Sequence, residues 1–298
     1  HALVDSSRGV SKVLSTSTAN AEFSTNSYVT SLNSDGFSVG SGDAGFNASN
    51  DIYVSWQWKA NGGTTASNTV GNINSVVQAN TDAGFAIVTY TGNGSANQTI
   101  GHGLGAVPKM ILFKNRSNAA YGYVYHVDTG NDTMTYLNLT NAAQSLSSQF
   151  STPTTTTFNV SNENSTFSGY NTNGNTYVAY VFADVQGYSK FGSYVGNGNA
   201  NGAFIYTGFK PAWVMVKRTD GVTNWRLFDS KRSGFNGDTS QLYPNLANAE
   251  DAAGDQIDLL SNGFKNRTAS GDQNISGASY IYMAFAENPF VTSTGIPT

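Results

Sequence analysis

The sequence contains no cysteine, so it can form neither disulfides nor a thiolate metal site. Charged residues make up only 11% of the chain and the net charge is −4, which leaves no basic stripe to neutralise the phosphates of a nucleic acid. No apolar run approaches the ~20 residues that a membrane-spanning helix needs. These absences predict a protein with no nucleic-acid partner and no membrane insertion, stabilised by packing or by oligomerisation.

Helix-favouring sequence is also scarce. The 298 residues include 32 glycines and many asparagines, serines and threonines, all of which rank low in helix propensity. Aromatic residues reach 12%, and with the abundant turn formers they favour β-strands joined by tight turns. Alanine and leucine cluster near residues 138–148 and 246–253, where we expect the only short helices. The predicted fold class is all-β with little helix.

One aromatic strand pattern is written three times. It reads YVSWQWKA over Tyr53–Ala60, YVAYVFAD over Tyr177–Asp184 and YIYMAFAE over Tyr280–Glu287. Because side chains alternate along a strand, every second residue of each copy shares one face. A position that accepts tryptophan, tyrosine or methionine alike is typical of a buried core. We therefore predict a structural core at Trp56, Trp58, Tyr180, Phe182, Met283 and Phe285.

Other motifs recur in the same order with a period of about one hundred residues, which is the length of a domain rather than of one solenoid turn. Each complete copy holds several short strands, which predicts tandem antiparallel β-sandwich domains of jelly-roll type. The predicted parts are the C-terminal part of an incomplete first repeat (residues 1–60), a polar linker with one edge strand near Ile73–Val77 (residues 61–83), a second repeat (residues 84–186) and a third repeat with a short C-terminal tail (residues 187–298).

The first copy begins in mid-repeat, because the motifs of residues 1–60 match only the later part of the other two copies. Two explanations stay open. The chain is truncated, or a different chain supplies the missing strands by β-augmentation.

Several longer motifs carry a family resemblance. IGHGLGAVPKMILFKNRS (residues 100–117), GFKPAWVMVKRTDGVTNWRLFDSKR (208–232) and SGASYIYMAFAENPF (276–290) resemble tandem domains of unknown function in structural proteins of marine bacteriophages. Those proteins are labelled tail-fibre-like or are grouped with lectin-like β-sandwiches. The resemblance implies a non-enzymatic virion structural protein on the particle surface, a homo-oligomer with a trimer favoured, and no catalytic residues or cofactor.

The leading functional hypothesis is a tail-fibre or appendage module that adheres to host-surface polysaccharide through many weak contacts. A purely structural fibre or filament subunit, assembled through inter-subunit β-strand contacts, is the first alternative. A glycan-active enzyme is the second alternative, and it requires two carboxylates within about 10 Å of each other in a groove. The candidate sugar-binding residues are Trp225, which follows a polar stretch, with Tyr121 and Tyr123.

The three histidines nominally allow a copper site built on an N-terminal His1 with His102 or His126. The repeat disfavours it, because His1 falls inside a strand block whose counterparts are not metal ligands. No metal site is therefore predicted.

Matched aspartates occur at Asp5, Asp128 and Asp229, one in each copy. We interpret them as turn residues whose carboxylates accept backbone N–H groups, and Asp229 as a partner of the basic residues that follow it. The oxygen-rich stretch Asp128–Thr133 lacks the ligand spacing of a calcium loop.

Two smaller motifs also recur. Gly-Asn-Gly at Gly92–Gly94 and Gly196–Gly198 predicts hairpin turns with positive φ. Two basic pairs, Lys114/Arg116 and Lys217/Arg218, end the strand that comes after a proline. Their recurrence predicts a structural role at a domain edge or a domain–domain contact.

Overall fold

A computed structural model describes residues 1–41, 44–146, 150–161, 169–232, 236–237, 240–252 and 254–289. The chain is all-β, as the composition predicts, and its ladders between strands are antiparallel. Helix is confined to short pieces such as α1 (Ala44–Asn47) and the 3-10 helix η1 (Val127–Thr129). None of the helices described is long and apolar enough to cross a membrane.

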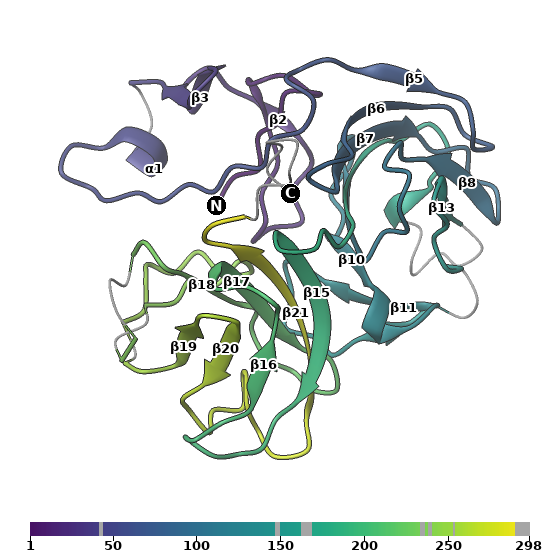
Figure 1. The fold of residues 1–298 in the computed structure, drawn as a ribbon. Helices are drawn as coiled ribbons and strands as arrows, with labels where there is room; N and C mark the ends of the chain where they lie inside the picture. The colour runs from purple at the N-terminus through teal and green to yellow at the C-terminus, as the bar shows by residue number, and fades with distance from the viewer. Residues whose placement is uncertain are drawn as a thin grey trace.

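Three segments surround a common centre, and we refer to residues 1–60, 61–186 and 187–289 as the first, second and third segments (Figure 1). The two stretches in which helices were expected contain none in their described residues. Residues 138–146 include a strand, and residues 246–252 include only an isolated β-bridge. Residues 147–149, residue 253 and the predicted tail at 290–298 lie outside the described part.

The second segment is a sandwich of a large sheet and a small one. The large sheet has the order β12-β11-β10-β9-β14-β7-β6-β5, and the small one pairs β8 with β13. The strands are β5 (Ala66–Asn68), β6 (Ser75–Asn80), β7 (Phe85–Thr91), β8 (Gln98–Gly101), β9 (Met110–Asn115), β10 (Tyr123–His126), β11 (Thr133–Tyr136), β12 (Gln144–Ser145), β13 (Thr157–Val160) and β14 (Thr176–Phe182). Tyr177, Ala179 and Val181 of β14 point into the core between these sheets.

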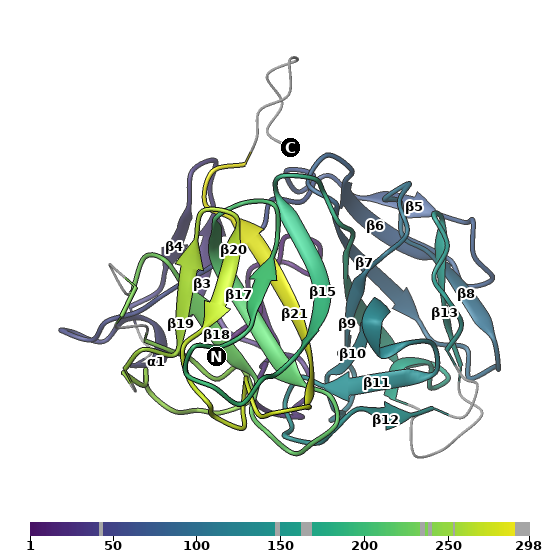
Figure 2. The ribbon, with the colours of Figure 1, turned by 60° about the horizontal axis from the view of Figure 1, so that its bottom comes forward.

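The third segment has the same design with a four-stranded and a three-stranded sheet (Figure 2). Their orders are β15-β21-β17-β18 and β16-β20-β19. The strands are β15 (Ser189–Val195), β16 (Phe204–Tyr206), β17 (Pro211–Arg218), β18 (Arg226–Asp229), β19 (Ile257–Leu260), β20 (Gly263–Asn266) and β21 (Ser279–Ala286). Tyr280, Tyr282 and Ala284 of β21 fill the core between them.

In its described residues, the first segment contains two small ladders, β1 (Lys12–Val13) with β2 (Phe23–Ser24) and β3 (Val29–Leu32) with β4 (Phe37–Val39). The strand predicted over Tyr53–Ala60 is absent. No backbone–backbone hydrogen bond joins residues 54–60 to another described residue. The reason is the lack of neighbours: β14 pairs with β7 and β9, β21 pairs with β15 and β17, and this segment has no equivalent of those flanking strands.

The stretch predicted as a polar linker over residues 61–83 belongs instead to the large sheet, although the strand expected near Ile73–Val77 is present as β6. It contains β5 and β6, and β6 pairs with β7 along its whole length, from Ser75 opposite Tyr90 to Asn80 opposite Phe85. Asn72 and Ile73 then bond to Thr99 of β8. The stretch looks like a linker because few of its side chains are apolar, but the backbone groups of β5 and β6 pair in the ladder whatever side chains they carry.

The predicted Gly-Asn-Gly turns do have positive φ, 71° at Gly94 and 66° at Gly198. They are not hairpins, however, because β7 and β8 belong to different sheets, as do β15 and β16. A buried asparagine holds each loop: the Asn171 Oδ1 accepts the Asn93 N–H at 3.1 Å, and the Asn274 Oδ1 accepts the Asn197 N–H at 3.0 Å.

The other face of each aromatic strand lies in a second core that all three segments share. Trp58, Phe182 and Phe285, which occupy the same place in the three copies of the motif, meet there with ring centroids 6.4, 5.5 and 6.3 Å apart. Trp56 and Trp58 are partly buried. We call this cluster the shared core, and its main members are Phe85, Ile87, Met110, Leu112, Val178, Tyr180, Phe182, Trp213, Met215, Ile281, Met283 and Phe285, with Trp56 and Trp58 packed against them.

Candidate functional site

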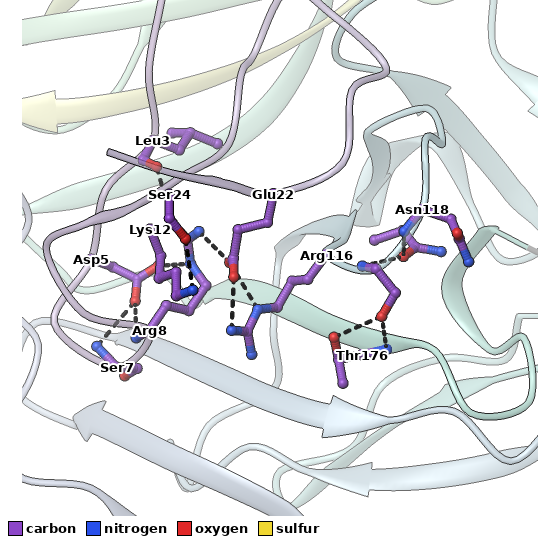
Figure 3. Close-up of polar contacts among 12 residues, drawn as sticks. Leu3, Asp5, Ser7, Arg8, Lys12, Glu22, Ser24, Arg116, Asn118 and Thr176 are labelled. Atoms are coloured by element: carbon purple, nitrogen blue, oxygen red, sulfur yellow. Dashed lines mark hydrogen bonds and ion pairs between the residues drawn. The ribbon is translucent and has the colours of Figure 1, made fainter. Parts of the chain in front are cut away.

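A buried polar cluster joins the first segment to the second beside the shared core (Figure 3). The Asp5 carboxylate accepts the backbone N–H groups of Ser7 and Arg8 at 3.0 and 2.8 Å, so it is the turn residue that its sequence position indicates. Its second oxygen accepts Arg8 Nε at 2.5 Å and the Tyr180 hydroxyl at 2.7 Å. The aspartate is therefore fully engaged in holding the turn against β14.

Glu22 extends the cluster. It accepts Arg8 Nη1 at 2.8 Å and both Nε and Nη2 of Arg116 at 2.9 and 3.0 Å. Burial acts to raise the pKa of Glu22, but the hydrogen bonds from Arg116 and Arg8 outweigh it and hold that pKa below its ordinary value. The carboxylate thus stays charged and links two arginines from different segments, as Figure 3 shows.

The same arrangement recurs in the third segment. Asp229 accepts the backbone N–H groups of Lys231 and Arg232 and pairs with Arg232 Nε at 2.6 Å, as its neighbours in the sequence indicate. Arg232 also bonds to Glu250 at 2.5 Å, and its guanidinium lies 6.0 Å from the Trp56 ring. Asp128 does not follow the pattern, because the chain has Asn131 where an arginine would be needed.

Two buried lysines make the other recurring contact between segments. Lys114 Nζ donates to the carbonyl of Thr18 at 3.1 Å, and Lys217 Nζ donates to the carbonyl of Thr140 at 3.2 Å. Burial lowers the pKa of each lysine to about 8. Each ammonium therefore fastens the end of a central strand to the preceding segment, which is the contact role that the recurring basic pairs predict.

The buried histidines have their ring nitrogens occupied. His102 lies 3.2 Å from the Thr154 carbonyl through Nε2 and accepts the Leu104 N–H through Nδ1. His126 lies 3.2 Å from the Tyr282 carbonyl and accepts the Asp128 N–H in the same way. His1 is exposed, and the described residues contain no group of three or more His, Cys, Asp or Glu side chains that could hold a metal ion.

His126 makes folding stability dependent on pH. Burial lowers its pKa to about 4, against about 6.5 in the unfolded chain. Below pH 6.5 the unfolded chain binds the extra proton first, so stability falls with pH down to about 4 and is unaffected by this group above pH 6.5. Urea unfolding should show about 2 kcal/mol less stability at pH 5 than at pH 7 from this residue. In a His126→Asn variant this loss of stability between pH 7 and pH 5 should disappear. If the unfolding free energy of the variant falls with pH as steeply as that of the parent, His126 is not the cause.

The candidate sugar-binding aromatics are mostly inaccessible, which corrects the sequence-based assignment. Trp225 is 1% exposed and its Nε1 donates to the Tyr136 carbonyl at 2.8 Å, so it packs between the second and third segments. Tyr123 is 3% exposed. Only Tyr121, at 45%, presents its ring to solvent, with an edge contact to Tyr136. The polar residues before Trp225 suggested a surface position, but they do not reveal that the second segment packs over its ring.

The sequence reasoning did not identify two exposed aromatics that lie on one strand. Phe204 and Tyr206 of β16 are 47% and 66% exposed, and Ile205 between them is buried. All three residues of β16, FIY, are apolar, so the sequence does not indicate which face of the strand is exposed to solvent. Surface aromatics on one strand face are a typical contact for sugars or for another protein.

The surface depressions hold few acids. One of about 410 Å³ is lined by Lys59, Asn61, Thr64 and Asn80, and Asp82 is its only carboxylate. Another of about 230 Å³ beside β6 and β7 is lined by Arg116 and contains no acid. Neither provides the paired carboxylates of a glycosidase.

Comparison with known proteins assigns a family without a function. The profile of the domain of unknown function DUF7483 matches residues 1–289. No curated protein and no solved structure matches the chain.

Proposed function

The chain belongs to that family, and we propose that it is a non-enzymatic structural protein of a virion, a module of a tail fibre or similar appendage on the particle surface. The observation that carries the proposal is the contact of Trp58, Phe182 and Phe285 in the shared core. The three aromatic faces that could have bound a ligand are used to hold the segments together. The phage resemblance supports the virion, and it favours a homo-oligomer, with a trimer first.

A role as a glycan-active enzyme has little support in the described residues. Asp5, Asp229 and Glu22 are engaged by arginines, and the depressions lack paired carboxylates. Incubation with host-envelope polysaccharides should release no reducing ends above the buffer control. Release that depends on an intact Asp or Glu would overturn the non-enzymatic assignment.

Adhesion to host-surface polysaccharide remains the proposed task of the appendage. The exposed aromatics Tyr121, Phe204 and Tyr206 offer ring faces for weak sugar contacts. Repetition of such contacts in an oligomer multiplies the strength of binding.

We expect the oligomer to bind at least one glycan on an array of bacterial envelope polysaccharides. Tyr206→Ala should weaken that binding by about fivefold or more, because an aromatic contact is lost, and Tyr121→Ala should be compared with it. Val222→Ala, at a residue 74% exposed, is the matched control and should bind like the parent. No binding on the array would leave the purely structural fibre subunit as the function.

The purely structural alternative is favoured by a separate observation. Residues 54–60 carry the aromatic strand pattern but make no backbone–backbone hydrogen bond to another part of the described chain. An unpaired segment beside an apolar core is a typical place for assembly by strand addition.

A further inference from the structure

The second and third segments differ at one sheet edge. In the second segment, β5 and the turn after it run along the edge of β8. The Ile73 N–H donates to the Thr99 carbonyl at 3.0 Å, and the Thr99 N–H donates to Asn72 Oδ1 at 3.2 Å. Gly101 of β8 has no room for a side chain, because a Cβ there would lie 2.2 Å from Asn68 Oδ1. The edge of β8 is therefore closed by the chain itself.

The third segment has no such cover. Residues 183–188 alone separate β14 from β15, so the described chain holds no counterparts of β5 and β6 for this segment. Thr99 and Phe204 occupy the same place, since each lies opposite the residue that follows a buried phenylalanine of the neighbouring strand. Gly101 and Tyr206 correspond in the same way. Two aromatic rings thus stand where the second segment has small, covered residues.

The backbone of β16 is open along the same edge (Figure 1). Ala203 and Thr207 bond to residues 262–266, so the N–H and C=O groups of the alternate residues Phe204 and Tyr206 point away from β20. No other part of the described chain donates to or accepts from these groups. Because β16 is only three residues long, and very short edge strands resist strand addition, the edge favours an occupant smaller than a β-strand.

The two rings form a platform with uncovered faces. Phe204 and Tyr206 are 47% and 66% exposed, and the buried Ile205 between them anchors the strand. Gly263 lies opposite Tyr206 and leaves its ring bare. A Cβ at Gly263 would lie 2.1 Å from the Ile205 carbonyl oxygen, so no side chain fits there. Among the described residues neither ring packs against another aromatic, whereas Tyr121 does.

A cation and an amide stand beside the platform. Lys265 lies opposite Phe204 on the same face of the sheet, and its Nζ donates to Asn201 Oδ1 at 2.6 Å. Asp258, the next residue across this face, pairs with Arg267 at 3.4 Å, and Lys265 forms no ion pair with a described carboxylate. The ammonium and the amide therefore remain as polar partners next to the rings, an arrangement typical of a site that orients a ligand with hydroxyl groups.

Building on the adhesion proposed above, we propose that the exposed face and edge of β16 bind a polysaccharide through successive pyranose units. Alternate residues of a strand are about 6.6 Å apart, so the two rings lie side by side and stack on the apolar faces of neighbouring sugar units. The sugar hydroxyls bond to the open backbone of Phe204 and to Lys265 and Asn201. The second segment has no equivalent site, because β8 carries neither ring and its edge is covered.

The full chain is screened on the array of bacterial envelope polysaccharides, and the polysaccharide that binds most strongly is then titrated in solution. Phe204→Thr combined with Tyr206→Gly gives β16 the residues of β8 and should weaken binding by about tenfold or more, because both stacking contacts are lost. Lys265→Gln should weaken it by about threefold or more, because a charged hydrogen-bond donor is removed. Tyr121→Ala, which removes a similarly exposed ring elsewhere, should bind like the parent.

Hydrogen exchange locates the ligand without any substitution. The amides of Phe204 and Tyr206 should exchange about threefold or more slowly when the polysaccharide is bound, because their N–H groups acquire partners, and those of residues 54–60 should not change. The unfolding midpoint of the Phe204→Thr/Tyr206→Gly protein should stay close to that of the parent, because both side chains are exposed.

Unchanged binding by that double variant, or an equal loss in Tyr121→Ala, would overturn this site and leave the proposed adhesion to another surface. Protection of the β16 amides without polysaccharide, together with dimers in sedimentation, would assign the edge to a second copy of the chain and overturn the site as well. If no polysaccharide binds the parent protein, the proposed adhesion fails, and the site fails with it.

Discussion

Replacing Phe182 with alanine is expected to lower the free energy of unfolding by about 3–5 kcal/mol, the usual loss for truncating a buried phenylalanine. Phe182 stacks on Phe85 at 4.9 Å and meets both Trp58 and Phe285 in the shared core. The cavity would lie where all three segments converge, so no single segment could relax to fill it. Urea unfolding monitored by circular dichroism measures the change.

The control for this variant is Val222→Ala, which should stay within about 0.5 kcal/mol of the parent because the residue is exposed. A double-mutant cycle with Trp58→Ala should show a coupling of about 0.5–1.5 kcal/mol, as expected for an edge-to-face aromatic pair. A loss below about 1 kcal/mol for Phe182→Ala would mean that the shared core contributes little to holding the segments together.

Removing the Arg8 guanidinium should be equally costly. In Arg8→Met, the Asp5 carboxylate stays buried against Tyr180 without its counter-charge, and Glu22 loses one of its two arginines. Breaking a buried ion pair from one side typically costs about 3–5 kcal/mol. Equilibrium denaturation at pH 7 is the measurement.

Two further variants separate the ion pair from simple loss of packing. Asp5→Asn combined with Arg8→Met should recover part of the lost stability, because the uncompensated charge is removed. Arg232→Met should cost less than Arg8→Met, because its partner Glu250 is much more exposed than Glu22. Equal costs for the two arginines would show that burial of the cluster is not what makes Arg8 important.

The composition and the alternation of residues determined a large part of this fold. The all-β class follows from few helix formers and many turn residues, and the strands around Tyr177 and Tyr280 follow from their aromatic pattern. The turn roles of Asp5 and Asp229 were also predictable, because an aspartate at the start of a turn typically accepts the backbone N–H groups of the next few residues. These features depend on local geometry, which neighbouring residues in the sequence specify.

The tertiary structure alone decided which segments acquire hydrogen-bonding neighbours. Tyr53–Ala60 carries the same aromatic pattern as β14 and β21 but forms no ladder, whereas the polar stretch that contains β6 does. A strand exists only when another strand lies beside it, and that partner is remote in the sequence. Burial of Trp225 depends in the same way on the carbonyl of Tyr136, 89 residues away. The sequence specified which faces are apolar; only the packing of the three segments specified what covers them.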